Sequence, residues 1–455
     1  MRGIRGGKTM LERVRSTTSL SFNRFAVCFA FVLLLANPRF VQSQSPENLK
    51  QQSPVTHHEQ SNEKAAKPRG VPDYSKITGF VANANLPIEQ PVVLWQATSE
   101  TIDGKGKVVS YSLTDAAIAD GILYFGDGKG AVIAFDANDQ SDLWTHVHGK
   151  RSSTEPSVDQ DNVYFGSEAG ITALRRENGK LIWHHAVEKG AGETMPIPVG
   201  EYVYTSGYNG RSYCLNRANG NVVWEHDFVE DAPPDPPEFA GASARFQEIL
   251  ARPRGAACNG KLFIQSVFDQ SRVIAINCET GKRSWSFQTG GWIGPAPTIA
   301  DGRVYVSSQD THLYCLNLET GALIWKYKSQ SWLASRAAVH NGIVYLPHHG
   351  GKLYQFNAET GELIRMFQPP DEADRKGLVY TFPLISQKTA YFSSGSGVFF
   401  AVNIETGELR WKLRPLKDSE FFGAPATDGR QIFVTSQKRN DEEGEQAIIA
   451  IGAAP

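Results

Sequence analysis

One recurring position in this chain gathers the side chains best suited to binding a charged ligand. When the repeated units of the sequence are aligned on their Asp-Gly turns, two acids and two arginines fall at that position in four of the units. Such a set would give a central channel a polarised lining that orients a charged peptide or a sugar acid. The same groups could equally pair with one another and stiffen the structure. The full set of equivalent residues is Asp115, Glu155, Met195, Arg254, Ala296, Arg336, Phe382 and Gly423.

Two tryptophans stand four residues before this position in neighbouring units. They are Trp292 and Trp332, just where the chain enters the first strand of each unit. Their rings would form a stacking platform at the mouth of the channel. The alternative is that they only cover the upper edge of the core. The candidate binding residues are therefore Trp292, Trp332, Asp115, Glu155, Arg254 and Arg336.

Other chemistry has little support in the sequence. Two histidine pairs occur, at 184–185 and 348–349, but adjacent side chains on a strand point to opposite faces, so we predict no metal site. No Gly-x-Ser-x-Gly elbow marks a hydrolase nucleophile, although a ring of repeats can bring catalytic groups together from distant units. We assign no catalytic, cofactor-binding or metal-binding residue from the sequence.

The elements that must position these residues are short strands in a unit that recurs about every 40 residues. The unit ends in a Gly-x-Leu-x-Trp pattern and is clearest from Cys315 to Trp325. Upstream, an Asp-Gly turn at 301–302 leads into an alternating aromatic and β-branched run, so each unit contains four strands. Further copies, two of them looser, lie at 134–144, 173–183, 214–224, 275–285, 355–365 and 401–411.

A four-stranded repeat of this length is typical of a propeller blade, because an isolated small sheet must stack on neighbours to bury its faces. Seven units run from Ser112 to Pro415, and an eighth begins at Gly423 but ends before its last strand. The run Pro91 to Trp95 matches the strand that is lacking. We predict an all-β, eight-bladed β-propeller of four-stranded antiparallel blades, in which the N-terminal strand completes the last blade.

The repeat explains cysteines and glycines that might suggest chemistry. Cys214 and Cys315 occupy a position where most other units have alanine, so we expect small buried core residues. A bridge between Cys258 and Cys278 is conceivable but disfavoured, because strands one and three of a blade are about 9.6 Å apart and a disulfide needs α-carbons within about 7 Å. The glycine of each Glu-Thr-Gly turn fits a left-handed hairpin position.

The ends and insertions of the chain divide it into three predicted regions. Basic residues, an apolar run from Phe25 to Ala36 and a small-residue cleavage pattern predict a signal peptide over 1–43. Residues 44–86 are rich in Gln, Ser, Glu and Lys and predict a disordered linker, and 87–455 form the propeller. Three insertions, at 230–253, 368–377 and 437–445, would lie on one face and are either its binding surface or tolerated surface additions.

Charge argues against a polyanionic partner. The chain has 46 Lys and Arg against 48 Asp and Glu, with a formal net charge of −2. Nothing in this balance favours nucleic acid or an anionic membrane. Cleavage of the signal would leave the chain without a stable membrane anchor, in the periplasm or outside the cell.

The phrases Asn317 to Trp325 and Asn403 to Trp411 resemble the pyrroloquinoline quinone (PQQ) repeat family of β-propellers. The resemblance covers about residues 110–415 and implies one of two functions. One branch contains quinoprotein dehydrogenases, which use PQQ with calcium and commonly carry an adjacent Cys-Cys pair or a Cys-x-x-Cys-His segment. The other is the BamB-type scaffold of outer-membrane protein assembly, which is normally lipid-anchored.

Neither cysteine pattern of the dehydrogenase branch occurs in this chain, and neither does a cysteine placed for lipid anchoring. We therefore expect a non-catalytic, exported scaffold without a cofactor that binds protein partners in the cell envelope. The resemblance implies a role in outer-membrane protein assembly. The alternative is a periplasmic PQQ-dependent alcohol or sugar dehydrogenase.

Overall fold

The fold is seen in a computed structural model that describes most of the region after residue 80. Described are residues 81–82, 86, 88–98, 101–102, 108–109, 113–127, 130–150, 154–187, 194–207, 209–228, 253–267, 271–371, 381–417, 419–438 and 446–454. The predicted signal peptide, most of the predicted linker and most of the three insertions lie outside these residues. Within them, all regular structure is β-strand, and no helix is long and apolar enough to cross a membrane.

Four blades occupy the first half of the ring, and each is an antiparallel sheet whose strands follow the order of the chain. Blade one contains β5 (Ala117–Ala119), β6 (Ile122–Gly126), β7 (Ala131–Asp136) and β8 (Ser141–Val147). Blade two contains β9 (Ser157–Val158), β10 (Asn162–Ser167), β11 (Gly170–Arg175) and β12 (Leu181–Ala186). Blade three contains β13 (Ile197–Val199), β14 (Tyr202–Ser206), β15 (Arg211–Asn216) and β16 (Val222–Asp227). Blade four contains β17 (Pro253–Cys258), β18 (Leu262–Val267), β19 (Arg272–Asn277) and β20 (Arg283–Gln288).

The second half of the ring repeats the arrangement. Blade five contains β21 (Thr298–Ala300), β22 (Arg303–Ser307), β23 (His312–Asn317) and β24 (Leu323–Lys328). Blade six contains β25 (Ala338–His340), β26 (Ile343–His348), β27 (Lys352–Asn357) and β28 (Leu363–Phe367). Blade seven contains β29 (Leu384–Ser386), β30 (Thr389–Ser393), β31 (Phe399–Asn403) and β32 (Leu409–Leu413). Blade eight contains β33 (Ser419–Thr427), β34 (Ile432–Lys438), β35 (Gln446–Ala453) and β2 (Pro91–Thr98).

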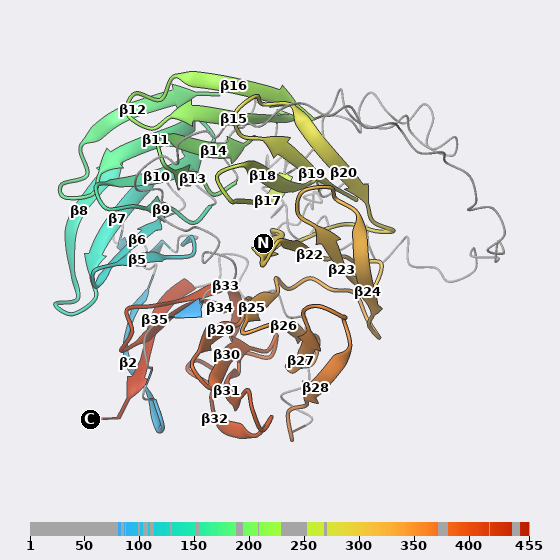
Figure 1. Ribbon diagram of the computed structural model, residues 1–455. Helices are drawn as coiled ribbons and strands as arrows, with labels where there is room; N and C mark the ends of the chain where they lie inside the picture. Colours follow the sequence, from blue (N-terminus) through green and yellow to red (C-terminus); the bar gives the residue numbers. More distant parts are fainter. Residues whose placement is uncertain are drawn as a thin grey trace, which may run out of the picture. The chain divides into compact units, whose positions relative to one another are not determined.

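The predicted eight-bladed propeller is confirmed. The first strands of successive blades lie next to one another from β5 through β9, β13, β17, β21, β25 and β29 to β33, and β33 lies next to β5. Figure 1 views these blades around their central axis. The core lies between blades: for example, Tyr305 and Cys315 of blade five pack in one cluster with Val344, Tyr354 and Phe356 of blade six. Each blade thereby buries faces that it could not bury alone.

The predicted closure by the N-terminal strand is also confirmed. β2 pairs antiparallel with β35 and takes the place of the outermost strand of blade eight. The segment before β2 also contributes, because Trp411 donates a hydrogen bond to the carbonyl of Ile88 over 2.7 Å. Further upstream, β1 (Val81–Ala82) pairs parallel with β29 of blade seven. Two short pairing strands, β3 (Thr101–Ile102) and β4 (Val108–Val109), connect β2 to blade one.

The repeated phrase corresponds to one cross-strand pair in every blade. In every blade except the sixth, a small residue on the third strand lies opposite the tryptophan of the fourth strand, and a register shift follows directly after the pair. In the eighth blade the pair joins Ala450 to Trp95, which explains why Pro91 to Trp95 matches the repeat. The pairs in chain order are Ala134 and Trp144, Ala173 and Trp183, Cys214 and Trp224, Ala275 and Trp285, Cys315 and Trp325, Gln355 and Arg365, and Ala401 and Trp411.

Six tryptophans of the repeat donate a hydrogen bond to the neighbouring blade or, for Trp411, to the segment before β2. Trp285, for example, donates its indole N–H to the carbonyl of Leu318 over 2.9 Å. The turn glycine of the next blade lies on the same ring, since a Cβ built on Gly321 would come within 2.5 Å of Trp285. Gly321 also has φ of +69°, as the sequence predicted for a left-handed hairpin position. The glycine is therefore required both by the turn and by the contact between blades.

Blade six departs from this pattern and compensates for it. Arg365 takes the place of the tryptophan, and Gln355 lies opposite in place of the small residue. The Gln355 side-chain amide donates to the carbonyl of Ile404 over 3.1 Å, at the position where the other blades use an indole. The hydrogen bond between blades is kept, although the ring is lost.

The cysteines of the described region belong to the core. Cys214 and Cys315 are fully buried, as predicted, and burial raises the pKa of each thiol to about 12. A thiol of that pKa stays protonated and unreactive near neutral pH. Cys278 is buried too, but the side chain of Cys258 lies outside the described residues, so the disfavoured bridge between them stays a prediction.

Candidate functional site

Residues at the aligned position of the repeat come together at the central channel. Asp115, Glu155 and Arg336 each precede the first strand of a blade by two residues. Arg336 lies over Phe382, the equivalent residue of blade seven, with 5.8 Å from its guanidinium carbon to the ring centre. Asp115 lies against Gly423, its counterpart in blade eight, where any Cβ would overlap its carboxylate. Contacts between equivalent residues of neighbouring blades are what a ring of first strands produces.

The three charged groups form an interacting cluster that spans the channel. Burial and, to a smaller extent, the nearby Asp115 carboxylate raise the pKa of Glu155 to about 8, although Arg336 acts in the opposite direction. Burial raises the pKa of Asp115 to about 7, against a hydrogen bond with Thr435. Both carboxyls keep some contact with solvent, but protein surrounds them closely enough to disfavour their charge. Near neutral pH the pair therefore holds protons that exposed acids would have lost.

Arg336 supplies the positive charge of this cluster. It is 8% exposed, and its Nε donates to the hydroxyl of Thr298 over 3.3 Å. Burial lowers its pKa to about 10, with Glu155 opposing the shift, so it stays charged at neutral pH. The other predicted arginine, Arg254, starts blade four within β17, but its side chain lies outside the described residues. The structure thus joins two acids to one arginine, and their role in binding stays a prediction.

Trp292 and Trp332 lie in equivalent loops of neighbouring blades. The Trp332 ring meets the His349 ring edge-on, with 6.3 Å between the ring centres. The carbonyl of Trp292 accepts a hydrogen bond from the backbone of Gln309 over 2.8 Å. Both side chains are partly exposed. The stacking platform and the contacts of these rings with a partner both stay predictions.

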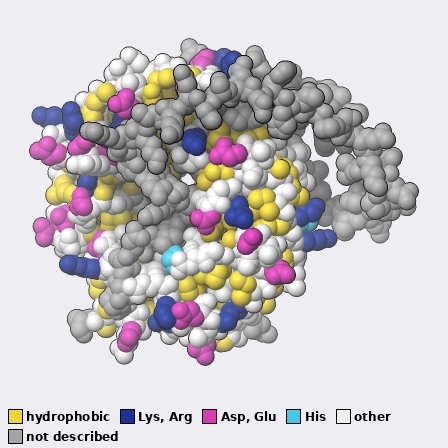
Figure 2. All heavy atoms as spheres, viewed as in Figure 1, with side chains coloured by type: hydrophobic (Ala, Val, Ile, Leu, Met, Phe, Trp, Pro, Cys, Tyr) yellow, Lys and Arg dark blue, Asp and Glu magenta, His cyan; other side chains and the backbone are white. Residues whose placement is uncertain are grey.

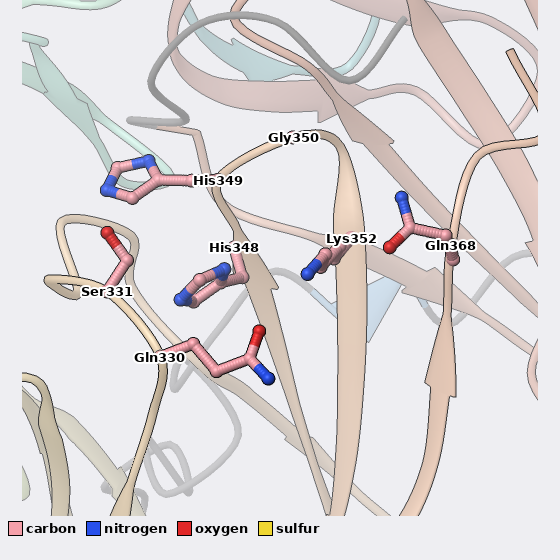
Figure 3. A pocket seen from close by; sticks show the side chains of 7 residues that line it. All are labelled: Gln330, Ser331, His348, His349, Gly350, Lys352 and Gln368. Atoms are coloured by element: carbon pink, nitrogen blue, oxygen red, sulfur yellow. The ribbon is translucent and has the colours of Figure 1, made fainter. Parts of the chain in front are cut away.

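A second site, which the sequence reading missed, lies beside blade six. It is an open pocket of about 500 Å³ formed by the loop after β24, the turn between β26 and β27, and the end of β28. Figure 3 shows the side chains converging around the imidazole of His348. The loops after a fourth strand and the turns between strands two and three thus share one face. The lining residues are Gln330, Ser331, His348, His349, Gly350, Lys352 and Gln368.

Hydrogen bonds set the state of His348 in this pocket. The Ser329 hydroxyl donates to the carbonyl of Ser331 over 2.6 Å, so its contact of 2.8 Å with His348 Nε2 places the proton on the imidazole. Burial lowers the pKa of His348, and it lowers the pKa of His349 to about 4. Both rings are neutral at neutral pH, and Lys352 is the cation among the lining residues.

The histidine pairs differ from the sequence expectation in one respect. His348 ends β26 and His349 begins the turn, so the two rings lie 5.3 Å apart and line one pocket rather than pointing to opposite faces. His184 and His185 do separate, with His184 against Thr172 and His185 against Tyr213. Among the described residues, no three His, Cys, Asp or Glu side chains gather as a possible metal site.

Comparisons with known proteins agree with the fold. The family model described as outer membrane protein assembly factor BamB matches residues 89–240 and 242–453. Outer membrane protein assembly factor BamB of Moranella endobia is 23% identical over 194 residues, which are 39% of this chain and 44% of that protein. The match thus spans less than half of the relative.

Two solved structures show how widely this fold is shared. BamB from Moraxella catarrhalis aligns with a TM-score of 0.58 at 15% identity, covering 79% of this chain and 100% of that chain. The quinohemoprotein alcohol dehydrogenase from Comamonas testosteroni aligns with a TM-score of 0.63 at 13% identity, covering 84% and 80%. At these identities the likeness concerns the fold alone and does not separate scaffold from enzyme.

Proposed function

Because this chain belongs to the PQQ-repeat family described as outer membrane protein assembly factor BamB, we propose that it is a non-catalytic scaffold that binds protein partners in the cell envelope. The role suggested by the family's description is assembly of outer-membrane proteins. Export through the signal peptide predicted over residues 1–43 would bring the chain to that compartment.

The observation that carries the proposal is the apolar character of the outermost strands. In β24, for example, Trp325 is buried while Leu323 and Ile324 are 44% and 43% exposed. The same strands are the outer edges of their sheets. Exposed aliphatic side chains beside an open sheet edge suit contact with another polypeptide. Comparable residues are Val93, Leu94, Leu143, Val147, Leu181, Val222, Val223, Leu363, Ile364 and Met366.

The surface charge is compatible with a protein partner. Figure 2 shows acidic and basic side chains interspersed over the face in view, without a broad field of either sign. Such a surface favours local complementarity over long-range attraction to a polyanion. The partly exposed Trp292 and Trp332 lie in loops between blades, and we include them among the contacts with a partner.

The described channel does not fit the calcium–PQQ pair of the dehydrogenase alternative. Calcium takes six to eight oxygen ligands as a rule, whereas the channel brings together two carboxyls that are partly protonated near neutral pH. The guanidinium of Arg336 lies in the same cluster and would compete with a cation. The alternative is still supported by the similarity of this fold to that of the quinohemoprotein alcohol dehydrogenase. Both functions therefore need a direct test.

The test is photo-crosslinking in the envelope of the native host. A photoreactive residue at position 324 on β24 should link to a component of outer-membrane protein assembly, identified by mass spectrometry. With the probe at position 324, Leu323→Lys and Trp332→Ala should weaken that link without loss of folding, while Lys326→Ala on the same strand serves as the control. Titration with PQQ and calcium, followed by dye reduction with alcohols and sugars, covers the alternative. Turnover in that assay would overturn the scaffold function.

A further inference from the structure

Blades five and six build the same corner, but they fill it differently. In blade five an acidic side chain occupies it: Asp310 Oδ2 accepts hydrogen bonds from the Gly290 backbone N–H over 2.6 Å and from the Tyr314 hydroxyl over 2.5 Å. His312 Nδ1 lies 3.3 Å from Oδ1 of the same carboxylate. Glycine is required beside it, because a Cβ on Gly290 would lie 2.9 Å from Asp310 Oδ2. Blade five thus contains a fully formed carboxylate site and its own carboxylate.

Blade six keeps the donors of this corner and lacks the acid. The turn between its second and third strands has the same length as in blade five, and glycine stands where blade five has Asp310. Gln330 and Ser331 stand in blade six where blade five has Gly290 and Gly291 against Asp310. Without an acid at position 350, there is room for their side chains. The corresponding residues are Gly350 for Asp310, Gln330 for Gly290, Tyr354 for Tyr314 and Lys352 for His312.

Blade three also brings a side chain of its own to the tyrosine of this corner. Asn209 occupies the position of Asp310 there, and its amide hydrogen-bonds the hydroxyl of Tyr213 over 2.6 Å. The tyrosine of this corner is thus present in blades three, five and six, but blade six brings no side chain to meet it.

Three donors of blade six are consequently without an acceptor among the described residues. They are the backbone N–H of Gln330, the hydroxyl of Tyr354 and the ammonium of Lys352. Tyr354 is only 3% exposed and its ring lies 5.1 Å from that of His348, which lines the pocket. No carboxylate is among the described residues that line the pocket.

We propose that the pocket beside Gly350 binds an aspartate or glutamate side chain of a protein partner, in the place that Asp310 fills in blade five. The carboxylate would accept from the Gln330 backbone and the Tyr354 hydroxyl, and it would balance the charge of Lys352. Neutral His348 and His349 adjoin it without repelling an anion. That the carboxylate belongs to a protein rests on the proposed function; the carboxylate site itself rests on the comparison of the blades.

The experiment is calorimetric titration of the folded chain with short capped peptides. An acetylated and amidated peptide with a single Glu should bind saturably, and the same peptide with Gln should bind at least about tenfold more weakly. Lys352→Ala should lower the affinity for the Glu peptide about tenfold. Tyr354→Phe, which keeps the buried ring, should lower it severalfold. Lys326→Ala, an exposed lysine on the neighbouring blade, is the matched control and should bind as the unchanged protein does.

Two further arms decide the source of the carboxylate and the place of binding. Glucuronate should bind more weakly than the Glu peptide; tighter binding of glucuronate would overturn the assignment to a protein. Gly350→Asp should bring a carboxylate to the pocket and abolish peptide binding, and circular dichroism checks that the variant folds, because φ is +76° at this position. Equal binding of the Glu and Gln peptides, or unchanged binding by Lys352→Ala and Tyr354→Phe, would overturn the site. Crosslinking to an assembly component with no peptide binding would leave the scaffold function standing and remove only this inference.

Discussion

The channel cluster shows how three residues far apart in the chain acquire properties that none has alone. Glu155 has a raised pKa because protein surrounds it and because Asp115 is near, while Arg336 offsets part of that effect. Such a cluster costs folding energy when its acids are charged and less when they hold a proton. The channel therefore makes the stability of the propeller depend on pH.

We predict that the protein is less stable at pH 8 than at pH 5. The folded pKa values of Asp115 and Glu155, about 7 and about 8, lie above the ordinary values of 3.8 and 4.5, so the folded state binds more protons in between. Stability is then highest at the acid end of this window and falls as pH rises through the folded pKa values. Glu155→Gln should raise the melting temperature by about 2–4 °C at pH 8.

The same variant should have little effect at pH 5, where Glu155 is already protonated. Thermal unfolding at both pH values measures the difference. Arg336→Met is the opposing control: it should lower the melting temperature most at pH 8, because it removes the cation that faces Glu155. A Glu155→Gln effect of equal size at both pH values would contradict the prediction.

At the scale of elements, the turn glycine and the tryptophan act as one fastening between blades. The Glu-Thr-Gly turn needs a left-handed residue, and the indole of the preceding blade lies directly on it. The glycine position therefore combines two separate requirements. Gly321 and Gly302 form a matched pair that separates these two requirements, because both have positive φ but only Gly321 lies against a tryptophan ring.

Gly321→Ala should destabilise the protein more than Gly302→Ala. Both glycines have positive φ, +69° and +71°, so both substitutions carry the backbone cost of about 1 kcal/mol. A Cβ on Gly321 would also come within 2.5 Å of Trp285, whereas a Cβ on Gly302 would meet nothing within 4 Å. The clash should add roughly 1–3 kcal/mol. Denaturant titration of both variants measures the gap, and equal losses would show that the ring contact adds nothing.

At the scale of the whole molecule, the propeller is closed by strands from opposite ends of the chain. β2 pairs with β35, and the segment before it accepts the Trp411 hydrogen bond through Ile88. Without β2, the edge of β35 and the tryptophan-binding surface of blade eight would face solvent. The ring therefore depends on about ten residues that precede the first complete blade.

We predict that a chain beginning at residue 99 loses cooperative unfolding and aggregates, because β35 becomes an exposed apolar edge strand. A chain beginning at residue 81, which retains β1 and β2, should unfold in one transition like the full chain. Size-exclusion chromatography and thermal unfolding compare the two. A monomeric, cooperatively folded chain from residue 99 would contradict the role of β2 in closure.

Much of the architecture was predictable because it is repeated. Eight blades, the four-stranded unit and the closing strand all follow from one spacing, since each blade must bury its faces against a neighbour with the same pattern. The burial of Cys214 and Cys315 followed from the alanines at their position in other units. The departure at Arg365 was visible in the sequence, but its compensation by Gln355 was not, because that contact crosses to the next blade.

The candidate sites were predictable only in part. Alignment placed Asp115, Glu155 and Arg336 at one level, yet their pKa values depend on how closely protein surrounds them in the channel. The pocket beside Gly350 was missed, although its signal, a tyrosine kept without its acidic partner, was present in the aligned repeats.

The sequence by itself determined the number of blades, the order of strands and the positions that face the channel, because these follow from local patterns repeated along the chain. Tertiary structure alone decided which repeated positions interact. The Trp332 ring meets the His349 ring, and Gln330 and Lys352 line one pocket with Gly350. Side-chain direction and burial arise only when loops from successive blades meet, and no spacing within one unit contains that information.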